Sequence, residues 1–391
     1  MIPRYAPTYT FNDLLNGLKQ SSDPDIENKL IARLKSYYNV RHAFLFGSGR
    51  EALYAVLKAY NRPGGVLIPA YNCIVVPEAI QFAGYRPVFV DIERNSLCMT
   101  AENVKKSLSS DVQAVFLTHI FGIPCEIQEI LDVLIKQNKD ILIVEDAAPA
   151  IGAEYNGQVV GSFGDASVIS FQSTKVISGE IGGALLTNNE NLAEKLKGLK
   201  LEAVGPGSDW MLFIKALARK FVTSRNVYEL AQFGYRTLRG EKMYEIVPPK
   251  VQKPKGFLSR CPSFSCALVF LQLDRLRWNL ERRRNLALIY QNELSKHTEV
   301  SLPEIAQACD PAWIQYPILV DDKLSFYKHM QRNQIDVSWT YRYSCAESFG
   351  IKGFPNSIHA AETIIGLPTS PFISDEQAME ICRVANQFRG R

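Results

Sequence analysis

Two residues of opposite charge each follow a short apolar run near the middle of the chain. Asp146 comes after the apolar residues 141–144, and Lys175 comes after the apolar residues 166–171. Apolar runs of this length are typical of buried strands, and parallel sheets carry catalytic groups just beyond the carboxyl ends of their strands. A lysine that can form a Schiff base and an aspartate that can pair with a pyridinium nitrogen are what pyridoxal 5′-phosphate (PLP) requires from a protein. Singly, each residue would be interpreted as a solvated charge. At two strand ends together, they indicate a PLP site.

A glycine-containing turn earlier in the chain is a candidate anion site. A short apolar strand is expected over residues 43–46, and a helix follows from about Leu53. Between them lie Ser48, Gly49 and Arg50. Backbone N–H groups at the start of a helix attract anions, and the helix dipole adds to this attraction. We therefore predict that this turn holds a phosphate group, with an ordinary glycine turn as the alternative.

The stretch from Glu145 to Gly183 is similar to one family of proteins. The motifs that carry the similarity are Glu145-Asp146-Ala147-Ala148, Gly164-Asp165, Ser170-Phe171, Lys175 and Gly179-Glu180-Ile181-Gly182-Gly183. They resemble the DegT/DnrJ/EryC1/StrS family, whose members are PLP-dependent aminotransferases with the aspartate aminotransferase fold (fold type I), mostly acting on nucleotide-linked keto-sugars. The resemblance extends over roughly residues 40–203 and 258–388, which is most of the chain by the standard of domain size.

The resemblance implies a role for each candidate site residue. Lys175 would hold the cofactor and then move protons between the substrate carbon and the cofactor carbon, with its pKa lowered by desolvation. Asp146 would stay ionised against the ring nitrogen and keep the ring an electron sink. Arg50 stands where the family has a threonine, so it would either add charge at the phosphate or point to solvent. The residues expected to hold the cofactor phosphate are Ser48, Gly49, Arg50 and Ser170.

Three positions depart from the family pattern. Pro149 replaces a Gln or His that contacts the ring hydroxyl, and Cys73 replaces the aromatic residue that stacks on the ring. Leu258 replaces an Asn that reaches the phosphate in the neighbouring subunit. In an extended segment Tyr71 projects to the same face as Cys73, so we predict that Tyr71 stacks on the ring in its place, with Cys73 beside it in the cofactor site.

The elements that would position these residues alternate between strand and helix. Strand patterns at residues 65–69, 87–91 and 114–118 alternate with helical patterns at residues 76–82 and 127–137. This order predicts an α/β fold with a doubly wound, mostly parallel sheet. We expect a large PLP-binding domain with an N-terminal arm over residues 1–255. A long connecting helix and a smaller C-terminal α+β domain are expected over residues 256–391.

Residues 204–256 lose the family pattern and form a segment that is longer than expected. A basic amphipathic helix within it can lie on a membrane surface or cover a partner, but most apolar stripes belong to a core. We therefore expect this helix to pack on its own domain, with peripheral membrane contact through residues 210–225 as the alternative. The apolar residues predicted to share its buried face are Trp210, Phe213, Ile214, Leu217 and Phe221.

The composition argues against several other classes of protein. At 391 residues, with 47% hydrophobic and 21% charged residues, the chain resembles an ordinary two-domain soluble protein. A net charge of +4 gives no reason to expect nucleic acid as a partner. Eight scattered cysteines and the absence of an apolar leader or a long apolar run favour a cytoplasmic protein without a membrane span or metal cluster. The run Arg282-Arg283-Arg284 is interpreted as solvated, with a position at the dimer interface as the alternative.

The leading hypothesis is a homodimeric aminotransferase that acts on small-molecule substrates. An amino acid, with glutamate as the expected donor, would supply nitrogen to the keto group of a nucleotide-linked deoxysugar. Two alternatives remain. A sugar dehydratase that uses the pyridoxamine form of the cofactor would carry histidine in place of the lysine, so Lys175 argues against it. A PLP-binding relative with a regulatory or scaffold role stays open because of the departures at Pro149, Cys73 and Leu258, since fold does not determine function.

Overall fold

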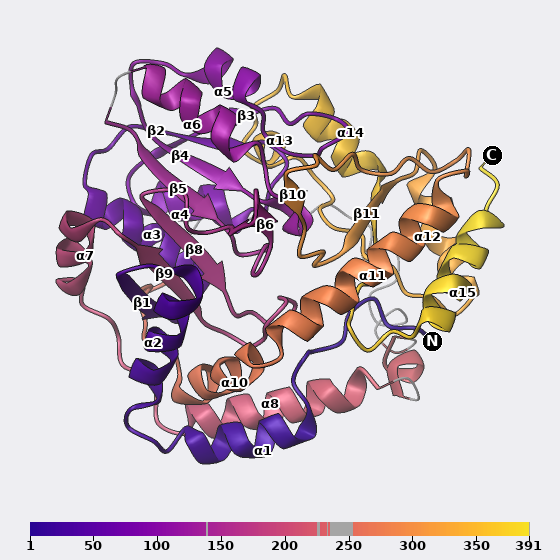
Figure 1. Ribbon diagram of the computed structural model, residues 1–391, viewed down its shortest axis with the longest axis horizontal. Coiled ribbons are helices and arrows are strands. Elements are labelled where there is room, and N and C mark those ends of the chain that lie inside the picture. The colour runs from indigo at the N-terminus through magenta and orange to yellow at the C-terminus, as the bar shows by residue number, and fades with distance from the viewer. Residues whose placement is uncertain (138–139, 225–226, 233, 235–252, 391) are drawn as a thin grey trace.

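The centre of the protein is a seven-stranded sheet in the order β1-β9-β8-β5-β4-β2-β3 (Figure 1). The computed structural model describes all residues except 138–139, 225–226, 233, 235–252 and 391. Neighbouring strands from β8 to β3 are parallel, whereas β9 runs antiparallel to both β8 and β1. The predicted α/β fold with a mostly parallel sheet is therefore confirmed. The strands are β1 (His42–Phe46), β2 (Gly65–Pro69), β3 (Arg86–Val90), β4 (Val112–Thr118), β5 (Leu142–Asp146), β8 (Ala166–Ser170) and β9 (Gly183–Thr187).

The register of the strands brings the candidate site residues to one edge of the sheet. Asp146 is the last residue of β5 and lies opposite Thr118, the last residue of β4. Ser170 ends the neighbouring parallel strand β8. The start of α3 (Gly49–Tyr60) reaches the same edge, because Ser48 forms a bridge with Gly182. Segments more than 100 residues apart in the sequence thus meet where parallel strands end.

Helices cover both faces of the sheet, which buries its strands on both sides. Side chains alternate along each strand, so that Leu67 belongs to one apolar core whereas Val66 and Ile68 belong to the other. The first core packs against α2 (Ile26–Tyr38), α5 (Ala101–Ser107), α6 (Ile127–Lys136) and α10 (Ser263–Leu273). The second core packs against α3, α4 (Val75–Phe82) and α7 (Glu190–Lys197).

The C-terminal part of the chain carries its own two-stranded antiparallel sheet, formed by β11 (Tyr316–Leu319) and β12 (Ile364–Leu367). The long helix α11 (Leu276–Leu294) runs from the side of the large sheet toward α15 (Figure 1). The N-terminal arm also reaches this part through a bridge between Ile2 and Ile335. The division into domains at residue 255 stays a prediction. The other helices here are α12 (Lys323–Arg332), α13 (Cys345–Ser348), α14 (Pro355–Thr363) and α15 (Asp375–Asn386), and a small third sheet joins β6 (Glu154–Tyr155), β7 (Gln158–Val159) and β10 (Cys309–Asp310).

Helix α8 (Ser208–Val222) lies beside α1 (Phe11–Gln20) at one end of the molecule (Figure 1). As expected, it packs on its own chain, and its buried residues are Leu212, Phe213 and Ala216. The predicted buried face was wrong apart from Phe213, because residues 210–214 are all apolar and surround the helix, so the pattern does not fix which side turns inward. The predicted face residues that are exposed are Trp210, Ile214, Leu217 and Phe221. No helix within the described part of the chain is long and apolar enough to cross a membrane.

Candidate active site

The residues predicted from the sequence surround one cavity of about 270 Å³ at the edge of the sheet. Of the predicted residues, Tyr71 alone does not line it. Pro149, which replaces a polar residue of the family pattern, also forms part of the wall. The predicted residues that line the cavity are Ser48, Gly49, Arg50, Cys73, Asp146, Ser170 and Lys175.

Asp146 places a buried carboxylate at the bottom of this arrangement. Its Oδ1 accepts a hydrogen bond from the Ala148 N–H at 3.3 Å, and its Oδ2 accepts one from the Thr118 hydroxyl at 3.4 Å. Both bonds are long, and within the described residues no cation lies at ion-pair distance. Burial raises the pKa of Asp146, and the charge of Lys175 opposes that rise only in part. A protonated ring nitrogen would supply the missing positive charge, so this carboxylate fits PLP.

Lys175 follows β8 in the loop that leads to β9. Burial lowers the pKa of its ammonium group, while the Cys73 thiol and the Asp146 carboxylate act in the opposite direction. The direction agrees with the one expected from the sequence. An amine whose charged form is disfavoured is more readily available as a base or nucleophile near neutral pH.

The turn before α3 forms a narrow cradle next to β8. Ser48 caps the helix, and its hydroxyl accepts a hydrogen bond from the Glu51 N–H at 3.2 Å. A Cβ on Gly49 would lie 3.0 Å from the Ser170 Cβ, and a Cβ on Gly183 would lie 2.5 Å from the Gly49 nitrogen. Only glycine allows this approach of backbone to backbone. The helix N-terminus and the Ser170 side chain therefore face one space that suits a phosphate group.

Arg50 lines the cavity, but its charge is largely used within the protein. Its Nη1 donates to Glu78 Oε2 at 3.0 Å, and the guanidinium lies over the Phe257 ring at 5.2 Å from the centroid. Glu78 is buried, so this ion pair fixes the arginine at the cavity wall. That Arg50 adds charge at a bound phosphate stays a prediction, because its charge is paired with Glu78 here.

The prediction that Tyr71 stacks on the cofactor ring is wrong. Tyr71 is fully buried, and its hydroxyl donates to the Thr340 carbonyl and accepts from the Tyr341 N–H, both at 2.9 Å. Its ring packs edge-on against Tyr341, with centroids 5.7 Å apart. Tyr341 is the aromatic residue that reaches the cavity, and Tyr71 holds it there. The sequence prediction used only the alternation of side chains along residues 71–73, so it could not identify an aromatic residue from a distant part of the chain.

A second cavity of about 450 Å³ adjoins the first, and the two share wall residues Cys73, Pro149, Lys175 and Tyr341, together with Gln172. It extends toward the N-terminal arm and helices α8 and α11. Three arginines that the sequence reasoning did not assign to a site line it: Arg4, Arg219 and Arg283. The interpretation of residues 282–284 as solvated was wrong for Arg283, which is 4% exposed.

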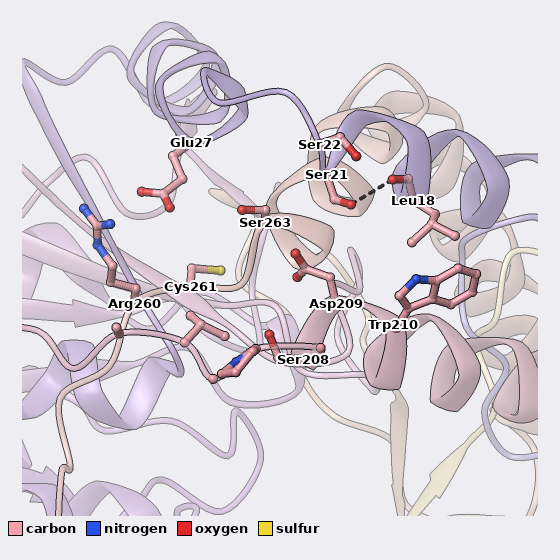
Figure 2. Close-up of a pocket in the computed structure, with 15 residues that line it drawn as sticks. Leu18, Ser21, Ser22, Glu27, Ser208, Asp209, Trp210, Arg260, Cys261 and Ser263 are labelled. Atoms are coloured by element: carbon pink, nitrogen blue, oxygen red, sulfur yellow. Dashed lines mark hydrogen bonds between the residues drawn. The ribbon is translucent and has the colours of Figure 1, made fainter.

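A separate hollow of about 660 Å³ lies between α1, the start of α8 and residues 260–263 (Figure 2). Figure 2 shows Arg260 and Glu27 on one side of it and Asp209 and Trp210 on the other. None of the predicted site residues lines this hollow. It is larger than the cavity around Lys175 but lacks the groups that cofactor chemistry needs.

The sequence and fold were compared with those of known proteins. The profile of the DegT/DnrJ/EryC1/StrS aminotransferase family matches residues 10–386. The chain is 26% identical to a GDP-perosamine synthase from Vibrio cholerae, over 99% of both chains. It is 24% identical to a dTDP-3-amino-3,6-dideoxy-alpha-D-galactopyranose transaminase from Aneurinibacillus thermoaerophilus, over 91% of this chain and 88% of that one.

The fold agrees with that of a solved structure from the same group of proteins. The PLP form of Spr1654 from Streptococcus pneumoniae superposes with a TM-score of 0.76 at 18% identity, covering 98% of this chain and 97% of that one. The family match runs over nearly the whole chain and includes both the lysine and the aspartate of the cavity. This protein belongs to the DegT/DnrJ/EryC1/StrS aminotransferase family, whose enzymes depend on PLP.

Proposed function

We propose that this aminotransferase moves an amino group from an amino acid, with glutamate as the donor, to the keto group of a nucleotide-linked sugar. The observation that carries the proposal is the convergence of Lys175, Asp146 and the Ser48–Gly49 turn on one cavity. The names of the relatives support the acceptor class, because both curated relatives described above make or modify nucleotide-linked amino sugars.

Each part of PLP would be held by different residues. Lys175 would hold the aldehyde carbon through its amine, Asp146 would face the ring nitrogen, and Ser170 with the turn at Ser48 and Gly49 would bind the phosphate. When bound, PLP supplies an electron sink for the carbon that exchanges nitrogen. The buried position of Asp146 makes it a strong partner for a cationic nitrogen, because the interaction is poorly screened there.

The chain's own groups account for the remaining chemistry. Once released, the Lys175 amine would take a proton from the substrate carbon and deliver it to the cofactor carbon, and its lowered pKa favours the neutral form that can accept the proton. Tyr341 and Pro149 contribute to the walls of both cavities, so they would bound the space in which the proton moves and limit the entry of water.

A homodimer and a cytoplasmic location also belong to this proposal. Arg260 lies in the segment where the family pattern has residues that reach the neighbouring subunit, and it faces the open hollow of Figure 2. A second copy of the chain that bound on this side would lie close to Arg260. All eight cysteines are free thiols, which suits a reducing compartment.

The experiment begins with the colour of the purified protein. We expect it to bind PLP and turn yellow, and borohydride reduction should fix the cofactor on the peptide that contains Lys175, as read by mass spectrometry. Glutamate should bleach an unreduced sample, and a nucleotide-linked amino sugar should do the same in the reverse direction. The variant Lys175→Ala is the control that cannot be trapped. A coloured protein that no amino donor bleaches would instead favour the regulatory relative.

A further inference from the structure

The second cavity, beyond Lys175, carries a charge that the protein does not balance. Arg283 lies on α11, is 4% exposed and lines this cavity. Its Nε donates to Asn279 Oδ1 at 2.8 Å, and its Nη1 donates to the Trp313 carbonyl at 3.1 Å and the Thr369 hydroxyl at 3.2 Å. All three acceptors are neutral. Among the described residues, none accepts a hydrogen bond from Nη2 and none forms an ion pair with this guanidinium.

The neighbouring arginines do not share this condition. Arg282 pairs with Asp375 at 2.5 Å, and Arg284 pairs with Asp310 at 2.9 Å. Consecutive residues of a helix point about 100° apart, so one of the three turns inward and the other two reach carboxylates nearer the surface. An isolated buried charge is strongly unfavourable unless an opposite charge meets it.

The other two arginines of the cavity also have carboxylate partners. Arg219 of α8 donates through Nε to both oxygens of Glu180 at 3.0 Å. Arg4 lies 3.5 Å from Asp336. Of the three arginines that line this cavity, Arg283 alone has no carboxylate partner among the described residues.

Three neutral polar atoms in the same cavity also lack partners. The Tyr5 hydroxyl, Gln315 Oε1 and Ser370 Oγ are buried and make no hydrogen bond within the described structure, and all three residues line the cavity with Arg283. Buried polar atoms are normally hydrogen-bonded. The Tyr5 and Ser370 hydroxyls and the unbonded nitrogen of the guanidinium can all donate hydrogen bonds, so they form a wall suited to a small, polar, singly charged anion.

We propose that Arg283 is the residue that anchors the carboxylate of the amino-acid substrate, with the Tyr5 and Ser370 hydroxyls as further donors. This inference rests on the proposed amino-transfer function. A planar carboxylate matches the guanidinium in shape and balances its single charge. A nucleotide diphosphate carries more negative charge than this one arginine balances, so the anchor belongs to the amino acid and not to the phosphates of the acceptor.

Burial lowers the pKa of Arg283 to about 10. The side chain therefore remains a cation at neutral pH, in surroundings of low polarity where its attraction for an anion is strong. Hydrogen bonds to Asn279, Trp313 and Thr369 hold the guanidinium in place, so it does not need to reorganise when the ligand enters.

The test measures binding without turnover. Calorimetry with the PLP-free protein should detect 2-oxoglutarate, the keto acid left when glutamate gives up its amine, and Arg283→Gln should weaken that binding by roughly 10- to 100-fold. Arg283→Lys, which keeps the charge, should recover part of the loss. Arg284→Gln serves as the matched control, because Arg284 lies on the same helix as Arg283 but pairs with Asp310. We expect wild-type affinity for this variant. Equal affinity of Arg283→Gln and the wild type would overturn the proposal.

The same variants separate the two substrates in the PLP-loaded protein. Arg283→Gln should still turn yellow and fold, as checked by its absorbance and near-UV circular dichroism. It should need a proportionally higher glutamate concentration for bleaching, while the concentration of nucleotide-linked amino sugar needed in the reverse direction stays the same. If only the required concentration of the nucleotide-linked amino sugar rises, the Arg283 charge belongs to the acceptor and the proposal is refuted. If wild-type protein is never bleached by any donor, the amino-transfer function fails, whatever the calorimetry shows.

If Arg283→Gln does not fold, Arg283→Lys carries the test alone. A lysine places one compact charge where the guanidinium presented a planar pair of N–H groups. We then expect folded, yellow protein whose affinity for 2-oxoglutarate is reduced about threefold or more. An unchanged affinity of Arg283→Lys would also refute the proposal, because it would show that the planar shape of the guanidinium does not contribute to binding.

Discussion

Glu145, the residue before Asp146, gives a prediction whose size can be worked out from its contacts. Its carboxylate is fully buried and accepts three backbone hydrogen bonds. Gly161 N–H donates to Oε2 at 2.7 Å, and the N–H groups of Phe163 and Gly164 donate to Oε1 at 2.6 and 2.9 Å. These bonds tie the turn before β8 to the end of β5, and β8 carries Ser170 into the cofactor cradle.

His119 limits what can replace this carboxylate. Its Nδ1 accepts from the Cys125 N–H at 3.2 Å, so the proton of the neutral ring is on Nε2. That Nε2 lies 3.5 Å from Glu145 Oε2. In Glu145→Gln, the amide oxygen can keep the hydrogen bonds from the Phe163 and Gly164 N–H groups. The amide NH₂ group then faces the Gly161 N–H and the His119 Nε2–H, which are both donors. The contacts of His119 with the Cys125 backbone and with Glu145 are those of a structural residue.

The magnitude follows from one lost charge-assisted hydrogen bond and one buried N–H left without an acceptor. We expect Glu145→Gln to lower the free energy of unfolding by about 3 kcal/mol. The melting temperature of the PLP-free protein should then fall by roughly 4 °C, because the unfolding entropy of a 391-residue chain is large. The matched control is Glu281→Gln, which removes an exposed partner of Arg277 and should change stability by less than about 0.5 kcal/mol. If both variants melt together with the wild type, the buried carboxylate does not hold the turn, and this reasoning is refuted.

Three further substitutions test the site. Gly183→Ala would put a Cβ 2.5 Å from the Gly49 nitrogen, so PLP titration of the variant should show at least about tenfold weaker binding; wild-type affinity would contradict this. Tyr71→Phe leaves the Tyr341 N–H without its acceptor, and we expect a loss of about 2 kcal/mol in urea unfolding and a higher substrate KM. Burial raises the pKa of Asp146 above its ordinary 3.8. The folded protein is therefore more stable at low pH, where this carboxyl is protonated, and that stability is lost as the carboxyl ionises at higher pH. Asp146→Asn should therefore raise the melting temperature of the PLP-free protein at pH 7, with the gain vanishing toward acid pH, while it abolishes amino transfer; a lower melting temperature at pH 7 would argue against an uncompensated charge.

The parts of the site that the sequence predicts correctly depend on local pattern. Apolar runs ended by Asp146 and followed by Lys175 identify strand ends, and the rules of parallel sheets then place such ends at one edge. The turn at Ser48 and Gly49 is recognisable in the same way, because a strand, a glycine turn and a helix follow each other directly. No knowledge of long-range packing is needed for any of these inferences.

The parts that the sequence could not predict depend on the rotation of helices and on distant segments. Arg283 stands between two residues of identical type, and only the packing of α11 decides which of the three faces inward. Tyr341 reaches the cavity through the position of a loop 270 residues after Tyr71. On α8, the apolar residues surround the helix, so the pattern predicts burial without giving its direction. In each case the deciding contact involves residues far apart in the chain.

Three charges at the cavities share one physical condition. Asp146, Lys175 and Arg283 lose hydration on folding without gaining an opposite charge at ion-pair distance among the described residues. Burial shifts the pKa of each toward the neutral form, upward for the aspartate and downward for the two bases. A ligand that supplies the missing charge reverses that shift, binds the folded chain and so stabilises it. The groups that make the PLP-free protein less stable are therefore the groups that select the cofactor and the carboxylate, and stability and recognition in this protein rest on the same residues.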